Sequence, residues 1–104
     1  MNNLGISEGE LDLIYDVFSQ NAAIEKAAVF GSRAKGNFRK YSDIDIALFS
    51  NENLLNVEDV IHRLEQLPLV YKFDVVAYET IRNAALREHI DRVGVVIYKR
   101  DTVR

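Results

Sequence analysis

Apolar residues recur along the chain at two different spacings, which predict helices that alternate with strands. The helical segments carry their own start and stop signals. Ser7 followed by Glu10 forms a capping box, Pro68 closes the second segment, and Gly94 stops the third. The helices predicted on this basis cover residues 7–19, 57–67 and 82–93.

Short apolar runs between these helices predict strands. In the segment over residues 43–49, the isoleucine and leucine side chains point to one face, whereas Asp43 and Asp45 point to the other. A brief helical turn is expected over residues 32–36, and a polar loop over residues 37–42. The predicted strands cover residues 27–30, 43–49, 71–78 and 95–98.

This order of elements predicts an α/β (α+β) fold, with a mixed β-sheet of about four strands and helices mainly on one face. If helices cover one face, the other face can carry charged strand residues that a core would not tolerate. The chain has 104 residues and shows neither an internal repeat nor a Gly/Ser linker. We therefore expect a single domain over residues 1–104.

Composition removes several classes of function. The 13 Lys and Arg residues against 16 Asp and Glu give a net charge of −3, which argues against a general nucleic-acid binder. The absence of cysteine excludes a disulfide framework and a zinc–thiolate site. The sequence has no signal-like start and no apolar run of about 18 residues. A soluble cytoplasmic protein without a membrane or direct nucleic-acid partner is expected.

The net charge hides one basic segment. Between residues 26 and 42 there are five basic residues and no acidic residue. The segment contains Gly31-Ser32, where glycine lets the backbone approach a ligand and amide groups at the turn attract phosphate. Arg33 and Lys35 follow directly and are candidate phosphate ligands. The alternatives are an ordinary Gly-Ser turn and a solvated basic loop.

Asp43 and Asp45 are the most informative acidic residues, because they share one face of an otherwise apolar strand. Two such carboxylates repel unless a cation or proton intervenes, and carboxylates completed by water and substrate phosphates suit Mg²⁺. The alternative is a polar strand edge in solvent. Asp74, in the predicted strand over residues 71–78, is the third candidate. Its alternative is a solvent-facing residue or a partner of Lys72.

The two histidines have simpler interpretations. His62 lacks a second ligand at metal-binding spacing and is interpreted as a surface residue. His89 lies at the edge of the apolar stripe of the last predicted helix and is interpreted as a packed or boundary residue.

Gly31-Ser32, ten intervening residues and Asp43-Ile44-Asp45 resemble the Gly-Ser-x10-Asp-x-Asp signature of the DNA polymerase β-like nucleotidyltransferase superfamily. Residues 31–36 and 42–47 together are similar to the minimal nucleotidyltransferases of the MntA family, antitoxins of HEPN/MNT systems. The order of predicted helices and strands extends this resemblance loosely over nearly all of the chain.

The resemblance implies a nucleotidyltransferase fold in which Gly31 and Ser32 hold the triphosphate of ATP. It implies that Asp43 and Asp45 bind two Mg²⁺ ions, and that Asp74 completes one metal site and accepts a proton from the attacking hydroxyl. It further implies a partner, a HEPN-domain toxin with ribonuclease activity. The chain would act as a type VII antitoxin by transferring AMP to a tyrosine of that toxin.

Two other functions stay open at this point. A non-catalytic antitoxin would neutralise a HEPN ribonuclease by binding alone. A small-molecule nucleotidyltransferase would modify an antibiotic, but larger relatives of that kind append further domains that hold the acceptor. A protein partner that supplies both the acceptor group and the surface that such further domains would provide is therefore favoured. We expect this partner to dock on an apolar helix surface.

Overall fold

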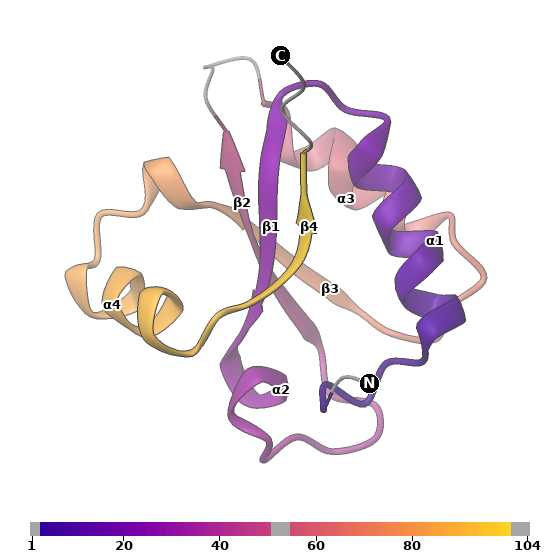
Figure 1. Cartoon of the computed structure of the whole chain (residues 1–104), viewed down its shortest axis with the longest axis horizontal. Coiled ribbons are helices and arrows are strands. Elements are labelled where there is room, and N and C mark those ends of the chain that lie inside the picture. Colours follow the sequence, from indigo (N-terminus) through magenta and orange to yellow (C-terminus); the bar gives the residue numbers. More distant parts are fainter. Residues whose placement is uncertain (1–2, 51–54, 101–104) are drawn as a thin grey trace.

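The computed structural model describes residues 3–50 and 55–100. Within these ranges the chain forms a four-stranded mixed sheet with the order β3-β2-β1-β4 (Figure 1). Strand β1 runs antiparallel to both β2 and β4, whereas β2 and β3 are parallel. In chain order the elements are α1 (Glu8–Ser19), β1 (Ile24–Phe30), α2 (Gly31–Lys35), β2 (Ile44–Ser50), α3 (Val57–Glu65), β3 (Phe73–Ala77), the 3-10 turn η1 (Tyr78–Thr80), α4 (Ala84–Val93) and β4 (Val95–Lys99).

The helices lie on both sides of this sheet and at one end of it. Figure 1 shows α1 and α3 together on one face, α4 on the opposite face, and α2 at the end where β1 passes towards β2. The predicted α+β fold with a mixed sheet of four strands is confirmed, and α4 adds cover to part of the second face. In the described ranges, no helix combines the length and the apolar character that crossing a membrane requires.

Two apolar clusters hold the helices against the sheet, one on each face. The larger lies between the sheet and the pair α1 and α3, and the smaller lies under α4. Because successive side chains of a strand point to opposite faces, alternate residues of β2 and β3 enter different clusters. Ile44, Ile46, Leu48, Phe73 and Val75 belong to the larger cluster, and Ala47 and Val76 pack in the smaller one.

The first helix begins as the capping box predicts. The Ser7 side chain accepts a hydrogen bond from the Glu10 amide at 3.1 Å, and the Glu10 side chain accepts one from the Ser7 amide at 2.9 Å. These contacts satisfy two of the amide groups that the first turn of a helix leaves unpaired.

The strand boundaries differ from the predicted ones at polar residues. β1 begins at Ile24, three residues earlier than the predicted start at residue 27, because Glu25 and Lys26 are part of the strand. The Lys26 ammonium lies 4.2 Å from the ring centroid of Phe49, its partner on β2, so a charged residue is accommodated there. β3 is shorter than predicted and begins at Phe73.

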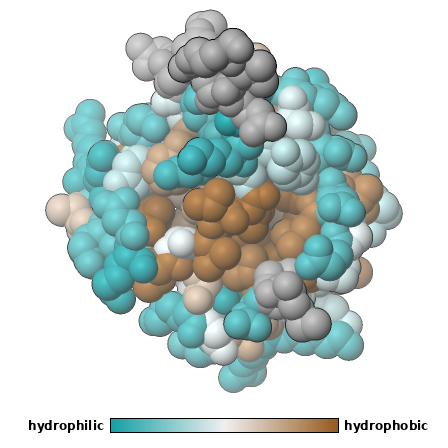
Figure 2. Space-filling view, viewed as in Figure 1, coloured by the Kyte–Doolittle hydropathy of each residue, from teal (hydrophilic) through white to brown (hydrophobic). Residues whose placement is uncertain are grey.

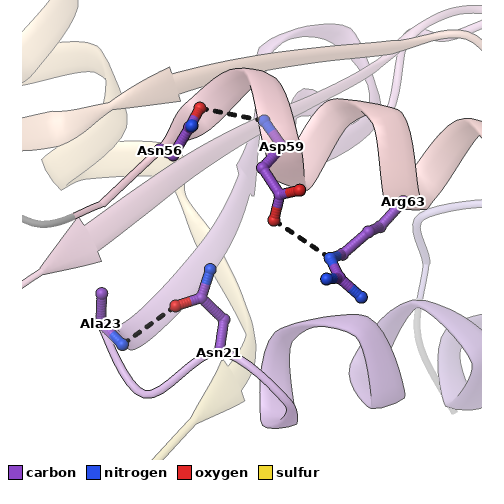
Figure 3. A network of polar contacts seen from close by, with 5 residues as sticks. All are labelled: Asn21, Ala23, Asn56, Asp59 and Arg63. Atoms are coloured by element: carbon purple, nitrogen blue, oxygen red, sulfur yellow. Dashed lines mark hydrogen bonds and ion pairs between the residues drawn. The ribbon is translucent and has the colours of Figure 1, made fainter.

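The turn into β1 and the start of α3 are fixed by local polar contacts (Figure 3). Asn56 caps α3 by accepting from the Asp59 amide at 3.1 Å, and the Asn21 side chain accepts from the Ala23 amide at 3.0 Å. Arg63 and Asp59 form an ion pair with an Nε to Oδ2 distance of 3.0 Å. Both side chains of the pair are about half exposed, so it adds little stability.

Strand β4 forms one edge of the sheet and exposes apolar side chains. Val95 is 37% exposed and Val96 is 51% exposed. Figure 2 shows an apolar patch in the middle of the view, where β4 lies in Figure 1. Tyr15 of α1 is also 44% exposed, so apolar surface lies on this helix as well as on the edge strand, and the docking surface expected on a helix stays a prediction.

Candidate active site

The structure brings the candidate aspartates together on the face of the sheet that α4 partly covers. Asp45 of β2 and Asp74 of β3 are direct partners in the parallel ladder. Both alternate with residues of the larger core cluster, so both point to the opposite face. Asp43 is exposed and precedes β2 by one residue, and it acts electrostatically on Asp45. The three carboxylates therefore form one acidic group at the start of β2.

Burial and neighbouring negative charges raise the pKa of Asp45 from its ordinary value of 3.8 to about 6. Desolvation is the largest cause, followed by the charges of Asp74 and Asp43 and a hydrogen bond between the carboxyl groups of Asp45 and Asp74. The positive charge of Arg33 opposes these effects only in part. The negative charge of the acidic group is thus compensated only in part, which is the electrostatic condition of a cation-binding site.

The donor set of this group suits Mg²⁺ better than a metal that needs a complete protein cage. In the described part of the chain, no three His, Asp or Glu side chains are arranged to enclose one ion. Mg²⁺ keeps several water ligands and is commonly held by one or two carboxylates together with substrate phosphates. The facing carboxylates of Asp45 and Asp74 fit that requirement.

Gly31 joins β1 to α2 directly beside these carboxylates. Its φ angle is +74°, a conformation that glycine adopts without steric cost. A side chain at this position would overlap the Asp45 carboxylate oxygen Oδ2, so only glycine lets the backbone lie this close. Ser32 follows in the first turn of α2 and is half-buried. The turn predicted as a phosphate contact and the acidic group are therefore neighbours.

The sequence interpretation missed a contact between this turn and α4. The Gly31 amide donates a hydrogen bond to Nε2 of His89 at 3.1 Å, although the two residues are 58 positions apart. The His89 ring also meets the Phe30 ring edge-on, with 6.1 Å between centroids. The apolar spacing of the last helix indicated a boundary position for His89, but no local signal pointed to an amide donor at the start of α2.

The Arg33 side chain is buried and donates hydrogen bonds to backbone carbonyl groups around it. Its side chain is 1% exposed. The guanidinium donates to the carbonyl of Leu4 at 2.7 Å, to that of Lys40 at 3.1 Å, and twice to that of Ser42, at 2.9 and 3.2 Å. These bonds tie the N-terminal segment and the basic loop to α2.

The surroundings of Arg33 argue against its interpretation as a phosphate ligand. Besides its carbonyl partners, the guanidinium carbon lies 4.8 Å from the ring centroid of Phe38 and 4.9 Å from that of Tyr71. A cation enclosed in this way is not available to a phosphate, and Arg33 is a structural residue. Lys35, in contrast, is exposed in the last turn of α2, where a contact with phosphate stays a prediction.

Replacing Arg33 with alanine is expected to lower the free energy of unfolding by roughly 2–4 kcal/mol, because it leaves buried carbonyl groups without donors. Arg63→Ala is the matched control, since it removes an arginine that is 55% exposed in a surface ion pair. We expect that control to change stability by no more than about 1 kcal/mol. Urea unfolding followed by circular dichroism measures both. Equal effects of the two variants would contradict the structural role of Arg33.

Comparison with known families shows which family the chain belongs to. The model of the family described as "Polymerase beta, Nucleotidyltransferase" matches residues 13–103. The chain belongs to this nucleotidyltransferase family. The match spans the Gly31 turn, Asp43, Asp45 and Asp74, so all candidate residues of this nucleotidyltransferase lie inside it.

Individual relatives agree with this assignment. A protein of Haemophilus influenzae described as "Probable protein adenylyltransferase MntA" is 31% identical over 100 residues, which cover 94% of this chain and 87% of the relative. A chain in the crystal structure of a toxin–antitoxin complex with AMP-PNP superimposes with a TM-score of 0.72 at 22% identity, covering 86% of this nucleotidyltransferase and 73% of that chain. A chain in the structure of the tri-AMPylated Shewanella oneidensis HEPN toxin with its MNT antitoxin gives a TM-score of 0.65 at 20% identity, with coverages of 86% and 70%. At these identities the structural matches establish the shared fold.

Proposed function

We propose that this nucleotidyltransferase is an antitoxin that transfers AMP from ATP to a hydroxyl group of a HEPN-domain toxin. The observation that carries the proposal is the pairing of Asp45 with Asp74 beside the Gly31 turn. Relatives supply the substrate and partner classes. One of them is described as a probable protein adenylyltransferase, and others come from toxin–antitoxin structures, one with AMP-PNP and one with an AMPylated HEPN toxin.

The proposed reaction is a single displacement at phosphorus. The hydroxyl oxygen of the acceptor forms a bond to the α-phosphorus of ATP, and the bond from that phosphorus to the bridging oxygen breaks, which releases pyrophosphate. The hydroxyl proton passes to Asp74, which is exposed and therefore accessible to an acceptor from solvent. Asp45 lies beside it on β2, where its carboxylate would help to hold Mg²⁺ next to the reacting phosphates.

The Gly31 turn serves to bind the triphosphate in this scheme. Ser32 supplies a hydroxyl donor next to a backbone that carries no side chain at residue 31. Lys35 is exposed nearby and adds a positive charge for the phosphates. Asp43, Asp45 and Asp74 are the residues that would hold Mg²⁺, and two ions are expected. When bound, Mg²⁺ supplies charge neutralisation of the phosphates and of the leaving group.

Incubation with ATP labelled on the α-phosphate, Mg²⁺ and a HEPN-domain toxin tests the proposal. Label is expected to appear on the HEPN protein, and its amount is expected to fall to background when EDTA removes the metal. ATP labelled on the γ-phosphate is the matched control, because adenylyl transfer leaves that phosphate in pyrophosphate and a kinase would retain it on the protein.

The same experiment separates the other two functions. A HEPN protein whose ribonuclease activity is inhibited without any transferred label would identify an antitoxin that acts by binding alone. Label that appears only on an added aminoglycoside would identify a small-molecule nucleotidyltransferase. Either result would contradict the proposed protein acceptor.

A further inference from the structure

His89 is held in one orientation by the helix that carries it and by β1. It lies on α4, next to Ile90, which is buried in the small cluster beneath this helix together with Phe30. The edge-on contact with the Phe30 ring, at an interplanar angle of 81°, restricts rotation of the imidazole. The imidazole is therefore fixed by packing before it makes any polar contact.

The polar contact that His89 makes is directed at the phosphate turn. Nε2 accepts the hydrogen bond from the Gly31 amide, so the ring proton of the neutral imidazole resides on Nδ1. Phe30, the residue before α2, makes no side-chain hydrogen bond that caps this helix. The imidazole of His89, which lies on α4, therefore serves as the acceptor for the first amide of α2. With Nε2 engaged in this way, the imidazole presents no donor to a phosphate through that atom.

The Gly31 amide needs a hydrogen-bond acceptor because the backbone of a glycine otherwise has large conformational freedom. Glycine populates both signs of φ about equally, so an unrestrained Gly31 would lose considerable conformational entropy on binding a ligand. In the structure its amide is held from the α4 side and its Cα lies against the Asp45 carboxylate on the other. The peptide between Phe30 and Gly31 is thereby set in one orientation relative to the acidic group.

We propose that His89 is a positioning residue for nucleotide binding, which fixes the Gly31 amide and so presets the Gly31-Ser32 turn for the triphosphate. The inference rests on the proposed function for the identity of the ligand, and it adds α4 to the binding machinery. His89 acts through Gly31 and does not itself touch the nucleotide. Its contribution is preorganisation, since it restricts the turn before the ligand arrives.

Three variants separate the hydrogen bond from the bulk of the side chain. His89→Gln places an amide oxygen within reach of the Gly31 amide, whereas His89→Leu removes the acceptor and keeps apolar volume. His62→Leu is the matched control, because His62 is exposed on α3 at the opposite face of the sheet. If the leucine variant at residue 89 fails to fold, His89→Met removes the acceptor with a more adaptable side chain.

Hydrogen exchange of the Gly31 amide, followed by NMR, and the Kd of AMP-PNP in the presence of Mg²⁺ are measured for each variant. His89→Leu is expected to expose the Gly31 amide to faster exchange and to raise the Kd about three- to tenfold. His89→Gln is expected to stay near the wild-type values in both measurements, and His62→Leu is expected to change neither.

Each contrary result has its own meaning. A Gly31 amide that exchanges equally in wild type and His89→Leu would overturn the hydrogen bond itself. Faster exchange with an unchanged Kd, or a Kd raised equally in the glutamine variant, would overturn the positioning role. A wild-type protein that retains Gly31 protection but does not bind AMP-PNP would contradict the proposed function and, with it, the role of His89 in binding.

Discussion

Asp45→Asn is expected to reduce nucleotidyl transfer at least about 100-fold and, at the same time, to stabilise the folded protein at neutral pH. Transfer falls because the substitution removes a negatively charged ligand of the Mg²⁺ that the proposed reaction requires. Stability rises because the wild-type carboxylate is ionised at pH 7 in a place where burial and the charges of Asp74 and Asp43 disfavour ionisation. After allowance for solvent screening, the gain is about 1–2 kcal/mol.

The pH dependence of stability follows from the direction of this shift. The pKa of Asp45 rises from 3.8 to about 6 on folding, so the folded state binds the proton more tightly than the unfolded state. The contribution of Asp45 to stability is therefore greatest below pH 3.8, falls as the pH rises through about 6, and stays low above it. The asparagine variant lacks this dependence.

Urea unfolding of wild type and of Asp45→Asn, at several pH values between pH 4 and pH 8, measures this effect as the difference between their free energies of unfolding. The contributions of other titrating groups cancel in this difference. Asp12→Asn, at an exposed position of α1, is the matched control and is expected to leave the difference near zero at every pH. An Asp45→Asn protein that is less stable than wild type at neutral pH would contradict the electrostatic description of the site.

Gly31→Ala is expected to lower the free energy of unfolding by roughly 2–4 kcal/mol and to weaken AMP-PNP binding at least about tenfold. Two effects combine at this position. An alanine at a φ of +74° is strained, and its methyl group would overlap the Asp45 carboxylate. The carboxylate or the turn must move, and either movement disturbs the arrangement that holds the triphosphate.

Two other glycines serve as controls and separate these effects. Gly36 has a φ of +85°, but a side chain there would meet nothing within 4 Å, so Gly36→Ala reports the backbone strain alone, about 1 kcal/mol. Gly9 lies inside α1 in open space, and Gly9→Ala is expected to stabilise the protein by about 0.5–1 kcal/mol. Thermal unfolding and calorimetric titration with AMP-PNP measure all three. A Gly31→Ala variant that matches Gly36→Ala in stability and nucleotide affinity would refute the close approach at Asp45.

The site could be predicted from sequence where its chemistry is local. Asp43 and Asp45 are two residues apart on one strand, so the period of a strand alone places both on one face. The Gly-Ser turn could be predicted for the same reason, because Gly31-Ser32 directly follows an apolar run and begins a short helical turn. The pairing of Asp45 with Asp74 was expected only from the position of Asp74 in an apolar run, and the parallel register confirms the pairing.

The parts that sequence reasoning missed depend on long-range contacts. Arg33 belongs to a basic stretch, and nothing local indicates that carbonyl groups as distant as that of Leu4 enclose its guanidinium. His89 reaches the Gly31 amide only because α4 packs on the second face of the sheet. The start of β1 was missed for a related reason, because Lys26 is accommodated by the Phe49 ring of a neighbouring strand.

The central claim is that the carboxylates of β2 and β3 and the Gly31 turn form one nucleotidyl-transfer site. Its most direct test is the amount of α-phosphate label that wild type and Asp45→Asn transfer to the HEPN partner at equal protein concentration with Mg²⁺. We predict labelled HEPN protein with wild type and almost none with Asp45→Asn, even though the variant is the more stable protein. Equal transfer by both proteins would contradict the account.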